Sequence, residues 1–201
     1  MSQGTLYIVS APSGAGKTSL LHEVRKRTEL TVAISHTTRN ARSGESNGQH
    51  YHFVSKHEFS QMVKDGEFLE HAEVFGNFYG TSRQEVMKLL NQGNNVVLEI
   101  DWQGAQQVRK IFPDAVSIFI LPPTIADLES RLRARGQDTD AIIAWRMDQA
   151  HSEISHYNEY DYLVINDRMD DAIQQLTYIF SEPDKYSPPK EDSMSALLSG
   201  L

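Results

Sequence analysis

A lysine and a threonine that follow a short glycine-bearing turn are the residues of this chain best suited to chemistry. The segment Ser10–Ser19 reads SAPSGAGKTS, so that Gly14 and Gly16 come before Lys17 and Thr18. Backbone N–H groups in such a turn and at the start of the next helix point at one spot, where the helix dipole adds partial positive charge. Lys17 supplies a full charge for terminal phosphates, and the Thr18 hydroxyl can ligate Mg²⁺. The pattern predicts a phosphate-binding loop.

The residues on either side of the turn meet the structural requirement of this motif. Thr5–Val9 is apolar and rich in β-branched and aromatic side chains, which is typical of a buried parallel strand. An amphipathic helix is expected to begin at Lys17. Ala11 stands where the motif has glycine and disfavours a positive φ there, but the two glycines of the turn keep its tight part open. A chance glycine-rich turn is therefore disfavoured.

Arginines form two clusters that could bind phosphate. Arg39 and Arg42 lie in a polar segment, and Arg131, Arg135 and Arg146 lie around a glycine further along the chain. Guanidinium groups bind phosphate oxygens bidentately and stay charged. Arg131 and Arg135 are four residues apart, so they share one helix face. Such a face beside a glycine break is what a movable lid over phosphates would need.

The composition excludes several classes of protein. The chain has 201 residues, which suggests one main domain with small insertions. A net charge of −8 argues against a general binder of nucleic acid or anionic membranes, so the cations of a phosphate site must be concentrated locally. Without cysteine, neither a disulfide framework nor a thiolate metal site is possible. We find no signal peptide and no run of about 18 apolar residues, so we expect a cytoplasmic enzyme.

Buried strands alternate with helices along the chain, which predicts a doubly wound parallel α/β sheet with ligands at the carboxyl ends of its strands. The strands of this core are expected at 5–9, 31–35, 95–101, 115–121 and 162–165. Its helices are expected at 17–28, 82–90, 104–112, 124–135, 139–157 and 169–180. The Pro- and Ser-rich tail from Ser181 could fray or dock as a helix, and the sequence leaves both open.

A smaller α/β insertion is expected within this core. Residues 36–82 are too polar and too rich in strand patterns to form a single crossover helix. Strands are expected there at 50–53, 68–75 and 77–81, and a helix at 56–64. The predicted organisation is therefore a core of residues 1–35, 83–125 and 149–201, an insertion of residues 36–82 and a helical lid of residues 126–148.

Several further motifs resemble those of the guanylate kinase family, in particular its bacterial members. They match in order and spacing between about residues 4 and 180: Ser35-His-Thr-Thr-Arg39, Arg42-x-Gly44-Glu45, Tyr51, Glu70, Phe75-Gly-Asn-Phe-Tyr79-Gly80-Thr81, Ile100-Asp101-Trp-Gln-Gly104, Arg131-x-x-x-Arg135-Gly136 and Ile165-Asn166-Asp167. The resemblance implies a core domain, a GMP-binding insertion and a lid. It implies transfer of the γ-phosphoryl group of ATP, with Mg²⁺, to GMP and to dGMP, in purine nucleotide metabolism and GMP recycling.

The resemblance also implies a role for each matched residue. The ATP phosphates would be wrapped by Ala11, Pro12, Ser13, Gly14, Ala15, Gly16, Lys17 and Thr18, with Asn166 near adenine. The lid would supply Arg131, Arg135 and Arg146. The GMP phosphate would be held by Arg39, Arg42, Tyr51 and Tyr79, and guanine would be read by Ser35, Glu70, Thr81 and Asp101. Glu99 stands where the family usually has Asp and could join Thr18 on the metal.

The chemistry of the residues agrees with these roles. Guanine offers an N1–H and an exocyclic amino group side by side, so one carboxylate such as Glu70 can accept both hydrogen bonds. Adenine offers neither donor there and would leave a buried Glu70 unpaired. The nucleophile, an oxygen of the GMP phosphate, is already anionic and needs no general base. Catalysis would consist of positioning and charge stabilisation by Mg²⁺ and by Lys17, Arg39, Arg42, Arg131, Arg135 and Arg146.

Three other interpretations stay open. A related P-loop kinase could act on another phosphorylated nucleoside or a sugar, although Ser35, Glu70 and Asp101 argue against it. A module that has lost catalysis could bind protein partners, although the intact Lys17 and the arginines argue against it. A GTPase switch would need a water-positioning glutamine and a guanine-specific loop, neither of which we find. The histidines lack the spacing of zinc ligands, Trp145 has no role that we can derive, and homo-oligomerisation is left open.

Overall fold

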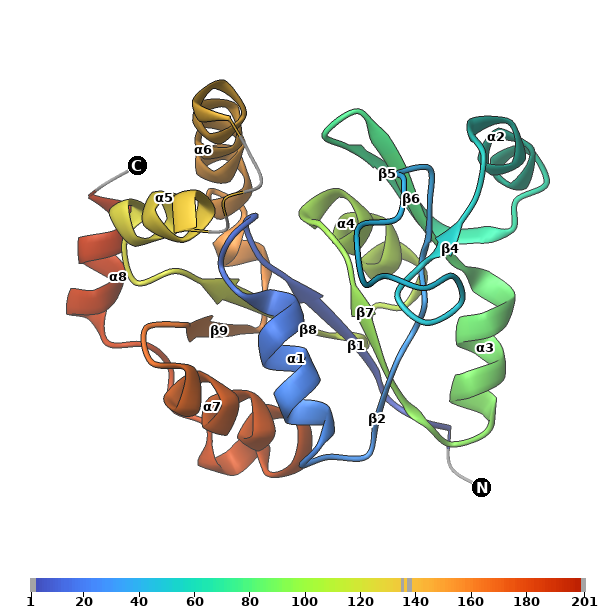
Figure 1. The fold of residues 1–201 in the computed structure, drawn as a ribbon. Helices are drawn as coiled ribbons and strands as arrows, with labels where there is room; N and C mark the ends of the chain where they lie inside the picture. The colour runs from blue at the N-terminus through green and yellow to red at the C-terminus, as the bar shows by residue number, and fades with distance from the viewer. Residues whose placement is uncertain (1–2, 135, 137–138, 200–201) are drawn as a thin grey trace. The chain divides into compact units, whose positions relative to one another are not determined.

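The chain folds as a mixed α/β protein with a parallel sheet, which confirms the predicted fold class (Figure 1). The computed structural model describes residues 3–134, 136 and 139–199. The strands of this sheet are β1 (Leu6–Ser10), β2 (Leu30–Val32), β7 (Asn95–Glu99), β8 (Val116–Leu121) and β9 (Tyr162–Ile165). Their order is β2-β7-β1-β8-β9, and the pairs β2–β7 and β8–β9 are parallel.

Two compact units divide the chain. The first holds Met1–Ile8 and Leu30–Val116, and the second holds Val9–Glu29 and Ser117–Leu201. The boundaries of these two units differ from those predicted for the core, the insertion and the lid. The division into core, insertion and lid stays a prediction. Because each unit gathers segments that are far apart in sequence, each can bring distant side chains together.

In the first unit, strand β7 is buried, and one helix precedes it and another follows it in the sequence. The side chains of Val96, Val97 and Leu98 are fully buried, as a strand covered on both faces requires. Helices α3 (Arg83–Asn91) and α4 (Trp102–Ile111) begin at capping side chains. The Ser82 hydroxyl and the Asp101 carboxylate each accept a backbone N–H of the first helical turn, which fixes where the two helices start.

A second sheet lies within residues 36–82 of the first unit. Its strands, in the order β4-β3-β6-β5, are β4 (His52–Phe53), β3 (His36–Thr37), β6 (Asn77–Ser82) and β5 (Phe68–Val74). The two strands predicted at 68–75 and 77–81 are confirmed as β5 and β6, and the structure pairs them antiparallel as a hairpin. The two loop residues, Phe75 and Gly76, have φ values of 52° and 73°, as in a type I′ turn. The predicted helix α2 (Lys56–Lys64) is also confirmed and begins with a capping box. Strand β3 was not predicted, because its two residues are held only by pairing with β4 and β6.

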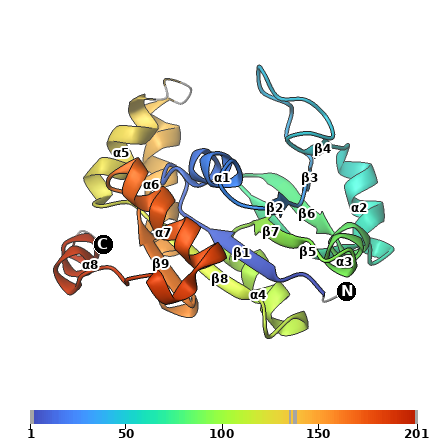
Figure 2. The same cartoon turned by 90° about the horizontal axis from the view of Figure 1, so that it is seen from below.

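Helices dominate the second unit. They are α1 (Lys17–Arg25), α5 (Ile125–Ala134), α6 (Asp140–Ile154), α7 (Met169–Ser181) and α8 (Glu191–Leu198). Helices α1 and α7 lie side by side in both views, and α5 packs on α6 (Figures 1 and 2). Thr124 accepts the Asp127 N–H at the start of α5, and Thr139 accepts the Ile142 N–H at the start of α6.

In the second unit, one helix ends earlier than predicted, and the tail has a structure that the sequence left open. The helix expected to reach residue 157 ends at Ile154, where the Ser155 hydroxyl donates to the Ser152 carbonyl and a 3₁₀ turn follows. The tail, left open by the sequence, forms α8. Before it, the Tyr186 hydroxyl donates to the Leu163 carbonyl (2.8 Å) and accepts the Leu163 N–H (3.2 Å), which ties the tail to β9. Among the described residues, no helix is long and apolar enough to cross a membrane.

Candidate active site

The predicted phosphate loop connects β1 to α1 in the second unit. Gly14 and Gly16 have φ values of 101° and 93°, which only glycine adopts without strain. Gly16 is the N-cap of α1, and Lys17 is its first helical residue. No side chain of the described residues caps this helix, unlike α3, α4 and α6. A helix start without a side-chain cap is the arrangement with which a phosphate loop binds an anion.

Close packing makes both loop glycines necessary, whereas the backbone conformation at Ala11, the first motif position, does not require glycine. A Cβ on Gly14 would lie 3.0 Å from Leu128, and a Cβ on Gly16 would lie 2.6 Å from the Asn166 side-chain nitrogen. Of the non-glycine residues that the structure describes, only Phe75 has a positive φ. Ala11 therefore does not need the left-handed conformation for which the motif's glycine would be suited.

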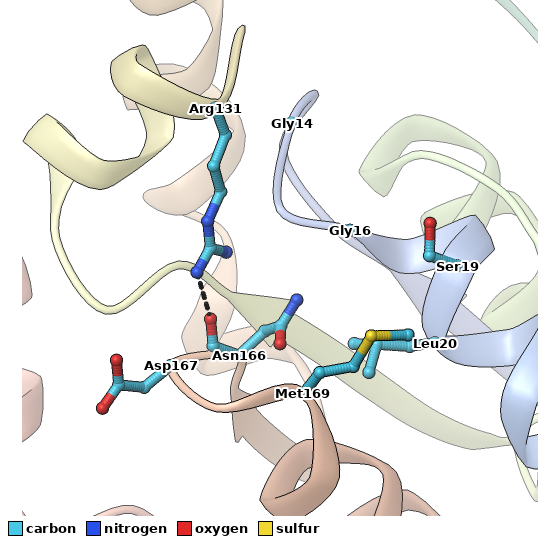
Figure 3. A pocket seen from close by; sticks show the side chains of 8 residues that line it. All are labelled: Gly14, Gly16, Ser19, Leu20, Arg131, Asn166, Asp167 and Met169. Atoms are coloured by element: carbon cyan, nitrogen blue, oxygen red, sulfur yellow. Dashed lines mark hydrogen bonds between the residues drawn. The ribbon is translucent and has the colours of Figure 1, made fainter. Parts of the chain in front are cut away.

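A pocket of about 320 Å³ opens beside this loop, a size suited to a small organic ligand (Figure 3). Asn166 connects the phosphate loop to α5 on two sides of the pocket. Its side-chain Nδ2 donates to the Ala15 carbonyl (2.7 Å), and its backbone carbonyl accepts Nη2 of Arg131 (2.8 Å). Arg131 Nη1 is buried and has no hydrogen-bond partner among the described residues. A buried cationic donor of this kind needs an acceptor, which an anionic ligand would supply. The lining residues are Gly14, Gly16, Ser19, Leu20, Arg131, Asn166, Asp167 and Met169.

Four of these lining residues were not assigned a role from the sequence. Ser19 and Leu20 follow the motif directly, and Asp167 stands inside the matched Ile165-Asn166-Asp167 motif without a role of its own. Met169 is a large apolar side chain that is 44% exposed at the first position of α7. Figure 3 draws Met169 and Leu20 among the side chains that line the pocket. The signal that could have marked this wall is a methionine two residues after the Asn166-Asp167 pair.

The remaining predicted residues of the ATP side lie around the same loop. Lys17 is half-buried and Thr18 is exposed, both in the first turn of α1. Arg146, on α6, donates from Nη1 to the Ser13 hydroxyl (3.4 Å), and Glu153 on the same helix accepts the Ser13 N–H (3.1 Å). Glu153 was not singled out by the sequence. Arg135 lies outside the described residues.

A buried hydrogen-bonded chain of three predicted guanine readers lies in the first unit. The exposed fractions of Ser35, Thr81 and Glu70 are 9%, 1% and 3%. The Thr81 hydroxyl donates to Glu70 Oε1 (2.6 Å) and lies 3.0 Å from the Ser35 hydroxyl. Because Thr81 has a single proton and gives it to Glu70, Ser35 must be the donor to Thr81. The chain fixes the Glu70 carboxylate in place as an acceptor.

The fourth predicted guanine reader, Asp101, has a structural partner on each carboxylate oxygen. Oδ1 accepts the Gly104 N–H (2.9 Å) as the N-cap of α4, and Oδ2 accepts Nε2 of Gln103 (2.9 Å). Each carboxylate oxygen can accept more than one hydrogen bond, so the cap leaves capacity for a ligand donor. Its role toward guanine stays a prediction.

The predicted phosphate ligands of the GMP side gather around one arginine. Both terminal nitrogens of Arg39 donate to the two oxygens of Glu45 (2.8 and 2.9 Å), and the guanidinium lies 5.4 Å from the ring centre of Tyr51. The Tyr51 ring meets the Tyr79 ring edge-on at 5.9 Å. Arg42 is exposed and donates its backbone N–H to Glu45 (2.7 Å). The motif Arg42-x-Gly44-Glu45 contains Glu45, but sequence reasoning gave it no role.

Protonation states in this cluster suit the binding of an anion. Burial would lower the pKa of Arg39, but the hydrogen bond to Glu45 and the nearby Tyr79 raise it overall. The Arg39 hydrogen bond lowers the pKa of Glu45. Burial, and then the charge of Glu99 at the end of β7, raises the pKa of Tyr51 to about 12. Tyr51 therefore keeps its proton and remains a hydrogen-bond donor at neutral pH.

No group of three or more His, Asp or Glu side chains that could hold a metal occurs among the residues the structure describes. A Mg²⁺ ion bound largely through nucleotide phosphates needs only one or two protein oxygens. The exposed Thr18 hydroxyl at the start of α1 is an oxygen of this kind. The residues present therefore fit an ion that arrives with a nucleotide.

A strand that runs into a glycine-bearing loop, with a lysine opening the next helix, defines a P-loop nucleotide-binding protein. The family model for guanylate kinase matches residues 3–183, and the chain belongs to the guanylate kinase family. It is 53% identical to the guanylate kinase of Vibrio cholerae serotype O1 over 204 residues, covering 100% of this chain and 99% of the relative. It is 57% identical to that of Hahella chejuensis over 181 residues, covering 90% and 87%.

A solved structure supports the same assignment. The crystal structure of guanylate kinase from Anaplasma phagocytophilum is similar to this chain with a TM-score of 0.76 and 32% sequence identity. The alignment covers 92% of this chain and 89% of that one. Fold and family therefore agree with the resemblance drawn from the motifs.

Proposed function

We propose that the protein transfers the γ-phosphoryl group of ATP to GMP, giving ADP and GDP. The observation that carries this proposal is the buried chain from Ser35 through Thr81 to Glu70, in a protein of the guanylate kinase family. The Glu70 carboxylate is 3% exposed and is held as an acceptor by the Thr81 hydroxyl, and each of its oxygens can accept more than one hydrogen bond. The Watson–Crick edge of guanine would supply two donors.

This arrangement would discriminate strongly against adenine. The N1–H and the exocyclic amino group of guanine both donate toward the position of a single carboxylate, whereas adenine places a lone pair there. Bound AMP would leave Glu70 desolvated without its partners, and sites of this kind reject the wrong ligand by a large factor. None of the proposed contacts to GMP involves the ribose, so dGMP is expected to be a substrate as well.

The GMP phosphate would be held by Arg39, Arg42, Tyr51 and Tyr79. Arg39 is held by Glu45 and stacked on Tyr51, so little freedom is lost when it binds an anion. The raised pKa of Tyr51 keeps its hydroxyl protonated, so it can donate to a phosphate oxygen. Charge and donors are thus gathered locally in a chain whose net charge is −8.

On the ATP side, the loop amides, Lys17 and Arg131 would bind the phosphates, and Asn166 would lie near the adenine. The buried Nη1 of Arg131, which lacks a partner among the described residues, supports this role. When bound, Mg²⁺ would draw charge from the phosphate oxygens, and Thr18 would be its protein ligand. Arg135 and Arg146 would contribute further charge from the lid, and Glu99 could assist at the metal.

The reaction needs no general base from the protein. An oxygen of the GMP phosphate is already anionic, so the obstacle is repulsion between two polyanions. Each pair of unit charges about 4 Å apart costs ~1 kcal/mol in water and ~4 kcal/mol at an effective dielectric constant of ~20. The residues therefore act by holding both substrates and by offsetting this repulsion while the γ-phosphoryl group moves.

A coupled assay of ADP release with a panel of acceptors tests the proposal. We expect rapid release with GMP, release with dGMP as well, and little with AMP or a ribose bisphosphate. Turnover of AMP that equals turnover of GMP would contradict the guanine-reading role of Glu70. No release above background with any acceptor would favour a module that binds partners without catalysis. Activity with GMP would place the enzyme in purine nucleotide metabolism and GMP recycling, for which the cytoplasm is the expected compartment.

A further inference from the structure

Ser13 in the phosphate loop is held at both of its polar groups by one helix. Its backbone N–H donates to Oε2 of Glu153 (3.1 Å), and its hydroxyl accepts Nη1 of Arg146 (3.4 Å). Both partners belong to α6 and are seven residues apart, which is about two helical turns. They therefore project from the same face of α6 toward the same residue of the loop.

A carboxylate at this place needs an explanation. A phosphate loop binds an anion, and a second negative charge close to it weakens that binding. The Arg146 guanidinium, which also reaches Ser13, offsets part of this repulsion. What Glu153 adds is a charge-assisted hydrogen bond to a loop amide, which is stronger than a bond to a neutral acceptor.

That bond fixes the orientation of one peptide unit in the loop. The Ala15 N–H donates to the Pro12 carbonyl, and the Asn166 side chain donates to the Ala15 carbonyl. The Pro12 carbonyl and the Ser13 N–H belong to one peptide unit, so the bond to Glu153 holds that unit at its second polar group, directly before Gly14. With this unit and the Ala15 carbonyl both held, the amides between them keep a constant direction.

We infer that Glu153 is a positioning residue for ATP, which acts through the Ser13 N–H and keeps the phosphate loop in its binding conformation. The inference rests on the proposed function, because it takes ATP as the ligand of this loop. It assigns Glu153 no contact with the substrate. It also gives Arg146 a place beside the loop from which it can reach a phosphate.

Two substitutions at Glu153 separate the hydrogen bond from the charge. Glu153→Gln keeps an acceptor oxygen at the same length, whereas Glu153→Ala removes it. We expect Glu153→Ala to raise both the Kd for ATP and the KM for ATP about tenfold or more, with the KM for GMP unchanged. Glu153→Gln should keep both constants within about threefold of those of the unaltered protein. Asp148→Ala, at an exposed acidic position of the same helix, is the matched control and should change neither.

The outcomes are distinct. The inference is wrong if Glu153→Ala leaves the Kd for ATP equal to that of Asp148→Ala, or if Glu153→Gln is as damaging as Glu153→Ala. If Glu153→Ala does not fold, Glu153→Asp replaces it, since it withdraws the carboxylate by one methylene and must raise the Kd for ATP with little change for GMP. Calorimetric binding of ATP alone decides the matter even if the unaltered protein fails to phosphorylate GMP, which would refute the proposed function separately.

Discussion

A Cβ atom on Gly104 would lie 2.5 Å from Oε2 of Glu70. Real Cβ atoms do not approach an oxygen so closely, so this position of α4 admits no side chain while Glu70 keeps its place. Gly104 also gives its N–H to the Asp101 carboxylate. The glycine therefore lets the start of α4 and the buried carboxylate of β5 occupy adjoining space, and it joins two of the predicted guanine readers.

Substitution of this glycine should damage GMP recognition selectively. Gly104→Ala would displace the Glu70 carboxylate, and misplacement of a binding group by about 1 Å can cost on the order of 100-fold. We expect kcat/KM for GMP to fall by about that factor, with the Kd for ATP unchanged. Steady-state kinetics and ATP calorimetry provide the two measurements. Lys110→Ala, at an exposed position of α4, is the control; equal losses in the two variants would refute the steric argument.

Replacing the Glu70 carboxylate by an amide tests the base-reading role directly. Glu70→Gln keeps the shape of the side chain but turns one acceptor into a donor that faces the guanine N1–H or amino group. We expect kcat/KM for GMP to fall by about 10- to 100-fold, the range for loss of a hydrogen bond to a charged group, with little change for ATP. Glu73→Gln, an exposed position on the same strand, should be neutral. A comparable loss for both nucleotides would show that Glu70 is not the reader of guanine.

Lys17 should matter more for turnover than for folding. Lys17→Ala removes a full positive charge at the start of α1, where charge develops on the transferred group, so turnover should fall to the background of the assay. The melting temperature should stay close to that of the unaltered protein. Lys26→Ala, at the exposed C-cap of the same helix, provides the comparison and should retain activity. Near-normal turnover of Lys17→Ala would contradict the assignment of the phosphate loop.

The pH dependence of stability should carry a contribution from His36. Burial, and then the charge of His52, lowers the pKa of His36 from 6.5 to about 4. Between these values the unfolded chain binds more protons than the folded one, so stability is lost as the pH falls from 6.5 toward 4. The two imidazole rings stack at 4.6 Å, so His36→Phe should keep the ring contact and remove this dependence.

Melting temperatures measured between pH 7.5 and 4.5 check this expectation. The drop in melting temperature on acidification should be smaller for His36→Phe than for the unaltered protein. His57→Asn, at an exposed position of α2, should behave like the unaltered protein. An equally large drop in His36→Phe would show that other groups cause the acid sensitivity.

The parts of the site that lie close together in sequence were predictable, and those that depend on packing were not. The phosphate loop was predicted because its glycines and Lys17 are contiguous and lie between a strand and a helix. The contact of Ser13 with Glu153 was not, because 140 residues separate the two and no local pattern links them. Met169 completes a pocket wall only because α7 packs beside α1.

Short elements show the same limit on the fold. The predicted bounds of helix α2 agree with the structure, in which the start of the helix depends on a local feature, the capping box of Ser55 and Glu58. Strand β3 was missed because His36 and Thr37 have no strand pattern of their own and are held by neighbours on both sides. Asp101 was expected to read a base, which stays a prediction. The structure shows it as the N-cap of α4, which its position before the helix could have indicated.

The bond between Tyr186 and Leu163 has a consequence for solubility. Strand β9 is the last strand of its sheet, and outer strands present N–H and C=O groups to which other chains can add. One phenolic oxygen occupies both groups of Leu163. A truncated protein that ends before Tyr186 would expose these backbone groups of β9. We expect it to self-associate by pairing at this edge strand, so the tail protects the edge of the sheet from aggregation.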